Sequence, residues 1–160
     1  MIEIVTGDIF DAKEKYLVHQ CNCVTKRAAH LAKDVFEHYP YADIYTARTE
    51  PDQPGHIIIR GNGQDQRYVV AILGQYYPGF PKYPDSKLDG KKARETHFYH
   101  GLLRLARVEN LESVAFPWRV GCGAAGGDWE HYLVNITNFA TYVKEKQGTR
   151  VVIYRREGDE

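Results

Sequence analysis

The sequence predicts a single α/β domain in which helices flank a central mixed β-sheet. Two observations predict it. Short β-branched and apolar runs alternate with segments whose apolar residues recur at helical spacing, and the 160 residues are about the length of one domain. Strands interleaved with helices over such a length form layered folds with helices on the faces of the sheet. We therefore expect one domain over residues 1–160.

Six short runs are predicted to be strands, and three longer segments to be helices. The strands are Ile2–Thr6, Tyr16–Cys21, His56–Arg60, Tyr68–Leu73, Ser113–Phe116 and Arg150–Tyr154. The third and fourth of them are separated by Gly61–Asp65, a turn composition that indicates an antiparallel hairpin. The helices are Ala28–Tyr39, Lys91–Arg107 and a segment that opens after Asp128 and ends near Lys146.

Composition excludes several classes of partner. Because 21 basic and 21 acidic residues cancel, no global field would hold duplex nucleic acid through many phosphate contacts. No apolar run approaches the roughly 18 residues of a membrane span, and the first residues alternate like a strand rather than a signal peptide. Three cysteines favour reduced thiols over a disulfide framework. We expect an intracellular protein, cytoplasmic or nuclear, that binds neither membranes nor, stably, duplex nucleic acid.

The strongest functional signal lies between the fifth predicted strand and the last predicted helix. The segment reads Val120-Gly121-Cys122-Gly123-Ala124-Ala125-Gly126-Gly127. Such small residues let backbone N–H groups approach a phosphate closely, and the following helix N-terminus favours an anion. The segment has neither the P-loop ending nor the spacing of the dinucleotide fingerprint. It indicates a diphosphate cradle, although a tight loop that packs a helix on a strand has the same composition.

Two other strand ends carry polar residues suited to ligand binding. Asn22 follows the second predicted strand in a loop that leads through Ala29 into a helix. Its amide could bond sugar hydroxyls or organise a turn. Asp8 follows the first predicted strand, and its carboxylate could accept from an adenine amino group or cap the segment after it. Ligands in α/β folds bind at the carboxyl ends of strands, so both are candidate site residues.

Taken in order, these motifs resemble the macrodomain family. The resemblance is carried by Gly7-Asp8-Ile9, by His19-Gln20-Cys21-Asn22-Cys23 leading to Leu31-Ala32, and by Pro117 through Gly121-Cys122-Gly123 to Asp128-Trp129-Glu130. It covers nearly the whole chain and is nearest the branch of ADP-ribose 1″-phosphate phosphatases and terminal ADP-ribose protein glycohydrolases. It implies a three-layer macrodomain fold, and ADP-ribose or an ADP-ribosylated molecule as the partner, with no cofactor.

The resemblance also implies roles for particular residues. Asp8 and the backbone of Ile9 would hold the adenine, Tyr154 would flank its ring, and Asn22 would bind the distal ribose in the loop that ends at Ala29. The diphosphate would lie on the backbone of the second loop, formed by Val120, Gly121, Cys122, Gly123, Ala124, Ala125 and Gly126.

Three positions depart from the pattern that the resemblance implies. His30 stands before Leu-Ala where relatives often have glycine, Gln75 where glycohydrolases of the branch have a lysine, and Ala125 where they have an acid. A lysine-adduct mechanism is therefore not expected. Asp128, which precedes Trp129 as in phosphatase-like members, could be a general base or a helix cap.

The preferred function is recognition of ADP-ribose with hydrolysis at its distal end, of a 1″-phosphate or of an ADP-ribosyl ester. A water activated by Asp128 or His30 would attack. The enzyme would then be a hydrolase. The alternatives are a reader that binds ADP-ribose without chemistry and a protein-interaction domain with a degenerate cleft.

The cysteines, the aromatic stretch and the basic residues after it each have a structural interpretation beside a functional one. Cys122 could be a nucleophile beside a base, but small buried thiols are common. No metal is expected, because His19, Cys21 and Cys23 on one strand would not surround an ion tetrahedrally. The stretch Tyr76–Tyr83 could cover a ligand, form an interface or pack as a turn. Most of the basic residues after Phe80 are expected on the solvated surface, and one could reach a terminal phosphate: Lys82, Lys87, Lys91, Lys92 and Arg94.

Overall fold

The structure is a computed structural model, and it describes residues 2–159 of the chain. Its strands are β1 (Ile2–Thr6), β2 (Tyr16–Cys21), β3 (Ile57–Gly61), β4 (Tyr68–Leu73), β5 (Ser113–Pro117) and β6 (Arg150–Arg155). Its α-helices are α1 (His30–His38), α2 (Lys91–Leu105) and α3 (Trp129–Gln147). Two short 3₁₀ helices span Ile9–Asp11 and Pro40–Ala42.

All these strands form one mixed sheet in the order β1-β6-β5-β2-β4-β3. Neighbouring strands are parallel except for β3, which pairs antiparallel with β4 at the sheet edge. The predicted hairpin is therefore confirmed. Because β1, β6, β5, β2 and β4 run in the same direction, their carboxyl ends meet at one edge of the sheet. Ligand sites of α/β folds form at this edge.

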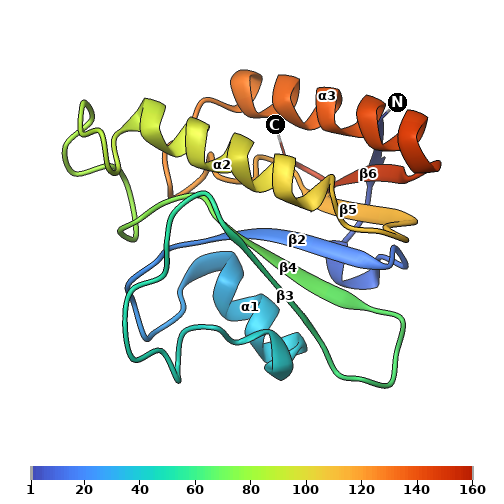
Figure 1. The fold of residues 1–160 in the computed structure, drawn as a ribbon, viewed down its shortest axis with the longest axis horizontal. Coiled ribbons are helices and arrows are strands. Elements are labelled where there is room, and N and C mark those ends of the chain that lie inside the picture. The colour runs from blue at the N-terminus through green and yellow to red at the C-terminus, as the bar shows by residue number, and fades with distance from the viewer. Residues whose placement is uncertain (1, 160) are drawn as a thin grey trace.

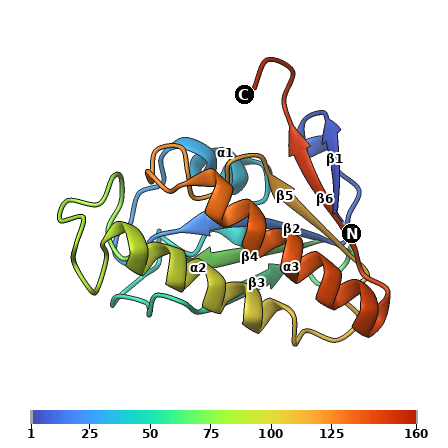
Figure 2. The ribbon, with the colours of Figure 1, turned by 90° about the horizontal axis from the view of Figure 1, so that it is seen from above.

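The helices cover both faces of the sheet (Figures 1 and 2). Helices α2 and α3 lie side by side on one face, and α1 lies on the other. Alternate residues of each strand supply the two cores. In β2, Val18 packs in the core under α2 and α3, whereas Leu17 packs in the core with α1. The three layers confirm the predicted α/β architecture.

The predicted helices are present, with different ends. Helix α3 begins after Asp128, whose side chain caps it, and ends at Gln147, before the C-cap residue Gly148, which has a left-handed φ of 74°. Helix α1 begins at His30 rather than Ala28, because the residue before it is extended and belongs to the preceding loop. The 3₁₀ helices were not predicted, since three residues leave no periodic pattern. No helix within residues 2–159 is both long and apolar enough to cross a membrane.

Candidate functional site

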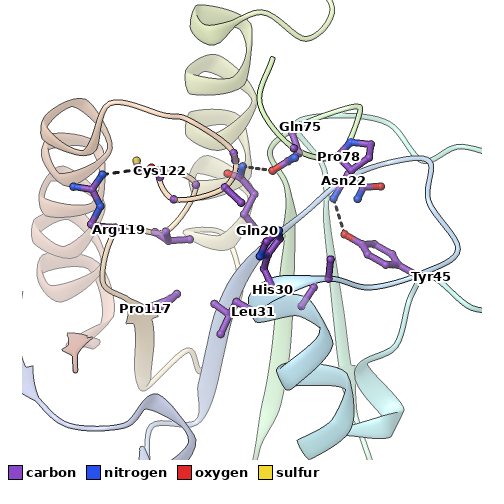
Figure 3. A pocket seen from close by; sticks show the side chains of 18 of the residues that line it. Gln20, Asn22, His30, Leu31, Tyr45, Gln75, Pro78, Pro117, Arg119 and Cys122 are labelled. Atoms are coloured by element: carbon purple, nitrogen blue, oxygen red, sulfur yellow. Dashed lines mark hydrogen bonds between the residues drawn. The ribbon is translucent and has the colours of Figure 1, made fainter. Parts of the chain in front are cut away.

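Three segments leave the carboxyl edge of the sheet around one cavity. The first loop, residues 22–29, follows β2, and the glycine loop, residues 118–128, follows the neighbouring strand β5. The aromatic segment, residues 74–90, follows β4 on the other side of β2. The end of β2 thus lies between the other two strand ends, and Figure 3 shows side chains from all three segments around the cavity.

Side chains hold the first loop in place. The Oδ1 atom of the buried Asn22 accepts from the N–H groups of Val24 at 3.0 Å and Thr25 at 2.9 Å, so this side chain organises the turn. The Asn22 N–H donates to the Tyr45 hydroxyl at 2.8 Å. The Arg48 guanidinium donates to the carbonyls of Asn22 and Thr25 and lies 4.8 Å from the Tyr45 ring. None of the described hydrogen bonds uses the side-chain NH₂ group of Asn22.

The first turn of α1 presents uncapped backbone N–H groups at the cavity. Its N-cap, Ala29, offers no side-chain acceptor, so the N–H groups of His30, Leu31 and Ala32 have no helical partner. Such a terminus attracts anions. His30 has a left-handed φ of 54°, which costs a non-glycine residue about 1–2 kcal/mol. Glycine would adopt this conformation without that cost.

The backbone itself folds the glycine loop. Its turns are closed by hydrogen bonds from Cys122 N–H to Arg119 O at 2.8 Å, from Gly126 N–H to Gly123 O at 3.1 Å and from Gly127 N–H to Gly121 O at 3.0 Å. Gly121 and Gly126 have positive φ angles of 76° and 78°. Among the described residues, no acceptor takes the N–H groups of Gly123, Ala124 and Ala125. Successive free N–H groups of this kind form a concavity that binds anions.

Two glutamines lie between the loops at the floor of the cavity (Figure 3). Gln20, at the end of β2, donates from Nε2 to Gln75 Oε1 at 2.7 Å, and Gln75 donates to Tyr77 O at 2.9 Å. Gln20 Oε1 is buried and has no hydrogen-bond partner among the described residues. A buried acceptor without a partner costs about 1–3 kcal/mol. The floor of the cavity therefore contains one buried acceptor that no described residue satisfies.

These segments surround a cavity of about 380 Å³, within the range of about 300–1,000 Å³ that is typical of small-molecule sites. The charged and titratable residues along it include Arg27, His30 and Arg119, and no aspartate or glutamate of the described chain lines it. Cationic side chains and free N–H groups without opposing carboxylates favour an anionic ligand. The cavity is thus suited to a phosphate-containing molecule.

Most of the predicted site residues line this cavity. They are Asn22, Ala29, His30, Val120, Gly121, Cys122, Gly123, Ala124 and Ala125. Gly126 lies under the aromatic segment instead, where an added Cβ would come within 2.4 Å of the Phe80 ring.

Other lining residues were not predicted as ligand contacts. They are Gln20, Arg27, Leu31, Ala32, Tyr45, Gln75, Pro117, Trp118 and Arg119. Pro78 and Gly79 also line the cavity, and they belong to the stretch Tyr76–Tyr83, for which covering a ligand was one of the alternatives. Gln20 is the last residue but one of β2 and Pro117 is the last of the neighbouring parallel strand β5, which strand alternation could have indicated. Tyr45 reaches the cavity from a distant irregular segment, and no local pattern marks it.

Asp8, Ile9 and Tyr154 lie outside the lining, at the start of the first connection and at the end of β6. Asp8 accepts from Phe10 N–H at 2.9 Å and so caps the first 3₁₀ helix, while Ile9 is buried in the core with α1. The Tyr154 hydroxyl donates to Glu14 at 2.6 Å, and burial, together with this carboxylate, raises its pKa to about 12. Since β6 and β1 follow β5 in the sheet, these residues are one and two strands away from the glycine loop.

Asp128 caps α3 and is not among the lining residues. Its Oδ1 accepts from Glu130 N–H at 3.2 Å, and its Oδ2 lies 3.6 Å from His131 Nε2. A hydrogen bond to Glu95 raises the pKa of His131. The contacts of Asp128 are therefore those of a helix cap, which was one of its two expected roles, and His30 is the catalytic candidate that lines the cavity.

All three thiols are buried, at Cys21, Cys23 and Cys122. Burial raises the pKa of each to about 12, so they are protonated near neutral pH and are poor nucleophiles. Cys122 thus acts as a small wall residue of the cavity. Burial also lowers the pKa of His19 to about 4. Within residues 2–159, no three histidine, cysteine or acidic side chains cluster as metal ligands.

One of the basic residues after Phe80 is not on the surface. Lys82, Lys87, Lys91 and Lys92 are exposed, whereas only 2% of Arg94 is exposed. The expectation that most of these side chains are solvated therefore holds, and Arg94 is the exception, because carbonyls and a carboxylate surround its guanidinium.

The sheet order, the helices on both faces and the cavity at the carboxyl ends of the strands define the macrodomain fold. No family model matches the sequence, and a search of curated proteins finds no match. The fold is instead recognised by comparison with solved structures.

The chain is similar to the macrodomain of Mycobacterium tuberculosis DarG, at 24% identity and a TM-score of 0.72, over 96% of this chain and 97% of that one. It is similar to Thermosipho africanus DarTG in complex with ADP-ribose, at 15% identity and a TM-score of 0.65, over 96% of this chain and 41% of that one. The Oceanobacillus iheyensis macrodomain with ADP is similar at 20% identity and a TM-score of 0.64, over 96% of this chain and 83% of that one. These likenesses confirm the predicted macrodomain fold.

Proposed function

We propose that the protein binds ADP-ribose, or the ADP-ribose group of a modified molecule, in the cavity between the first loop and the glycine loop. The observation that carries the proposal is the set of free N–H groups at Gly123, Ala124 and Ala125, which share one cavity with the uncapped N-terminus of α1. Both features favour a phosphate. Similar structures contain ADP-ribose and ADP, and these ligands share the diphosphate that such a cradle would hold.

In this proposal the diphosphate lies on the glycine loop, and the distal ribose lies toward Asn22 and His30. The adenosine extends past the end of β6 toward β1. There the second carboxylate oxygen of Asp8, which the capping bond does not use, accepts from the adenine amino group beside the backbone of Ile9. The ring of Tyr154, held by its bond to Glu14, flanks the base.

We further propose that the protein hydrolyses the bond at the distal ribose, of a 1″-phosphate or of an ADP-ribosyl ester. His30 would activate the attacking water, since histidine is the residue type that exchanges protons near neutral pH. Its position in the lining supports this role over Asp128. Gln75 and Ala125 supply neither an ammonium nor a carboxylate to the cavity, so the proposed chemistry uses no lysine adduct.

A second candidate function is a reader that binds ADP-ribose without chemistry. One observation favours it: none of the described aspartates and glutamates lines the cavity, so a carboxylate base is missing there. The two functions make the same prediction for binding and opposite predictions for turnover.

Calorimetric titration of ADP-ribose tests the binding site, with Gly123→Val as the variant. Gly123 has no positive φ, and no atom lies within 4 Å of an added Cβ, so the free protein tolerates the side chain. A diphosphate on the loop would meet it. We expect the affinity to fall about tenfold or more, which is about 1.4 kcal/mol, at an unchanged melting temperature. No heat with the parent protein at high micromolar ligand would refute ADP-ribose binding.

Turnover of ADP-ribose 1″-phosphate and of an ADP-ribosylated protein separates the enzyme from the reader. We expect His30→Gln to lower turnover by about a hundredfold, the usual size of a general-base contribution, while ADP-ribose affinity holds. Asp128→Asn should turn over normally, because asparagine caps a helix about as well as aspartate. If the parent binds ADP-ribose but turns over neither substrate, the protein is a reader. Loss of turnover in Asp128→Asn alone would transfer the catalytic role to Asp128.

A further inference from the structure

A buried ion pair lies behind the two walls of the cavity. Arg94 on α2 is 2% exposed, and Asp89, just before the helix, is 6% exposed. Arg94 Nε lies 3.0 Å from Asp89 Oδ1, and Nη2 lies 2.7 Å from Oδ2, the two-bond geometry that is strongest for arginine and a carboxylate. Charges at this depth require a full set of partners, and the pair has them.

The guanidinium of Arg94 uses all five of its N–H groups. Besides its two bonds to Asp89, Nη1 donates to Gly79 O at 2.5 Å and to Ala125 O at 3.1 Å, and Nη2 donates to Tyr77 O at 3.1 Å. Tyr77 and Gly79 belong to the aromatic segment, whereas Ala125 belongs to the glycine loop. One side chain therefore joins two cavity walls that are far apart in the sequence.

Other contacts join the same two segments. Asp89 accepts from the N–H groups of Tyr76 at 2.6 Å and Tyr77 at 3.1 Å. Within the ion pair, Asp89 therefore binds backbone N–H groups of the aromatic segment, and Arg94 binds its carbonyls. The Tyr77 carbonyl also accepts from Gln75 at the cavity floor. The Phe80 ring packs directly against Gly126. The ion pair thus fixes the aromatic segment against the glycine loop.

We propose that Arg94 is the positioning residue that keeps the glycine loop ready to bind an anion. The peptide between Ala125 and Gly126 is held at both ends, its carbonyl by Arg94 and its N–H by Gly123 O. With the carbonyl held toward α2, the cavity keeps the free N–H groups of Gly123–Ala125. A released carbonyl could turn into the cavity, where it would repel a phosphate oxygen. The inference rests on the proposed ADP-ribose site, because phosphate is the group that this cradle would hold.

The variant Arg94→Lys tests this role, because lysine keeps the charge beside Asp89 but has three donors for five acceptors. The matched control is Arg104→Lys, on the same helix, whose arginine donates to Gly55 O at 2.7 Å, outside the cavity lining. Two measurements are made on each protein: calorimetry with ADP-ribose, and amide hydrogen exchange over residues 76–80 and 121–127.

We expect Arg94→Lys to bind ADP-ribose about tenfold more weakly or worse, since bonds to a charged donor are lost from both walls. Exchange should rise in both segments together, and Arg104→Lys should match the parent in both measurements. Parent-like affinity in folded Arg94→Lys, or faster exchange in one segment alone, would overturn the inference.

A parent protein that does not bind ADP-ribose would refute the proposed function. The exchange data alone would then decide whether Arg94 holds the aromatic segment and the glycine loop together. Should Arg94→Lys fail to fold, Asp89→Asn is measured in the same way. It keeps the guanidinium but replaces a carboxylate oxygen by an NH₂ group that faces other donors, so the same loss of affinity and the same paired rise in exchange are expected. Parent-like behaviour of Asp89→Asn would overturn the inference equally.

Discussion

The first loop and the glycine loop flank the same cavity but are built in opposite ways. Side chains hold the first loop: Asn22 organises its turn, and Arg48, 26 residues away from Asn22, donates to its carbonyl. The glycine loop is closed by its own backbone bonds and by left-handed glycines, and Arg94 holds one of its carbonyls from behind. A loop closed by few backbone bonds keeps N–H groups free for an anion. A loop held by side chains instead places chosen groups, such as the Asn22 amide, beside the cavity.

The largest effect should come from a side chain in the glycine loop at Gly121. Its φ is 76°, and an added Cβ would lie 2.7 Å from both Gln20 Oε1 and the Tyr132 ring. Left-handed strain of about 1–2 kcal/mol and overpacking of about 1–3 kcal/mol add, so Gly121→Val should lower the free energy of unfolding by about 2–5 kcal/mol in urea titrations. Gly63→Val is the control, because Gly63 has a φ of 77° with nothing near its Cβ. An equal loss in both variants would exclude the packing contribution.

Acid should destabilise the strand that carries the first loop. His19 in β2 is fully buried with a pKa of about 4 instead of 6.5, so between these values the unfolded chain binds a proton that the folded chain does not. Stability is therefore lost as the pH falls from 6.5 to 4, by about 3 kcal/mol at most. The strand β5, which carries the glycine loop, has no titratable residue. The free energy of unfolding, measured across this pH range, should change less in His19→Leu than in the parent protein. Identical pH profiles would mean that His19 is not the cause of the loss of stability in acid.

Loss of a side-chain anchor should weaken the first loop to a smaller extent. Arg48→Met removes the donors to Asn22 O and Thr25 O and should lower the free energy of unfolding by about 2 kcal/mol, the typical size for bonds to a charged group. The control is Lys33→Met, which removes an exposed pair with Glu37 and should cost about 0.5 kcal/mol or less. Comparable losses in the two variants would mean that Arg48 does not anchor the loop.

The smallest effect should be a gain at the start of α1. His30→Gly relieves left-handed strain of about 1–2 kcal/mol but adds the backbone entropy cost of glycine, about 0.5–1 kcal/mol. The expected net gain is about 0.5 kcal/mol, read from melting curves. Arg119 in the glycine loop has a similar φ of 61°, so Arg119→Gly should behave alike, whereas His30→Ala keeps the strain. A destabilised His30→Gly would mean that the imidazole makes contacts that outweigh the strain.

The two loops also differ in how far the sequence predicted them. Gly121–Gly127 was predicted to be a diphosphate cradle because its composition and its place between a strand and a helix are local features. The first loop was located by Asn22, but its anchors Tyr45 and Arg48 were missed, since they lie in an irregular segment without periodicity. The sequence did not single out Arg94 among the basic residues after Phe80, because charge alone does not indicate burial when the partners are carbonyls of remote loops.

The sequence by itself determined the alternation of strands and helices, the β3–β4 hairpin and the glycine loop between β5 and α3, because each depends on residues that are neighbours along the chain. The tertiary structure decided the strand order that brings β4, β2 and β5 together. It also placed His30 in the cavity lining and Asp128 outside it, and it buried Arg94 between two loops. These outcomes depend on contacts between residues far apart in the sequence, which form only when the helices pack on the two faces of the sheet.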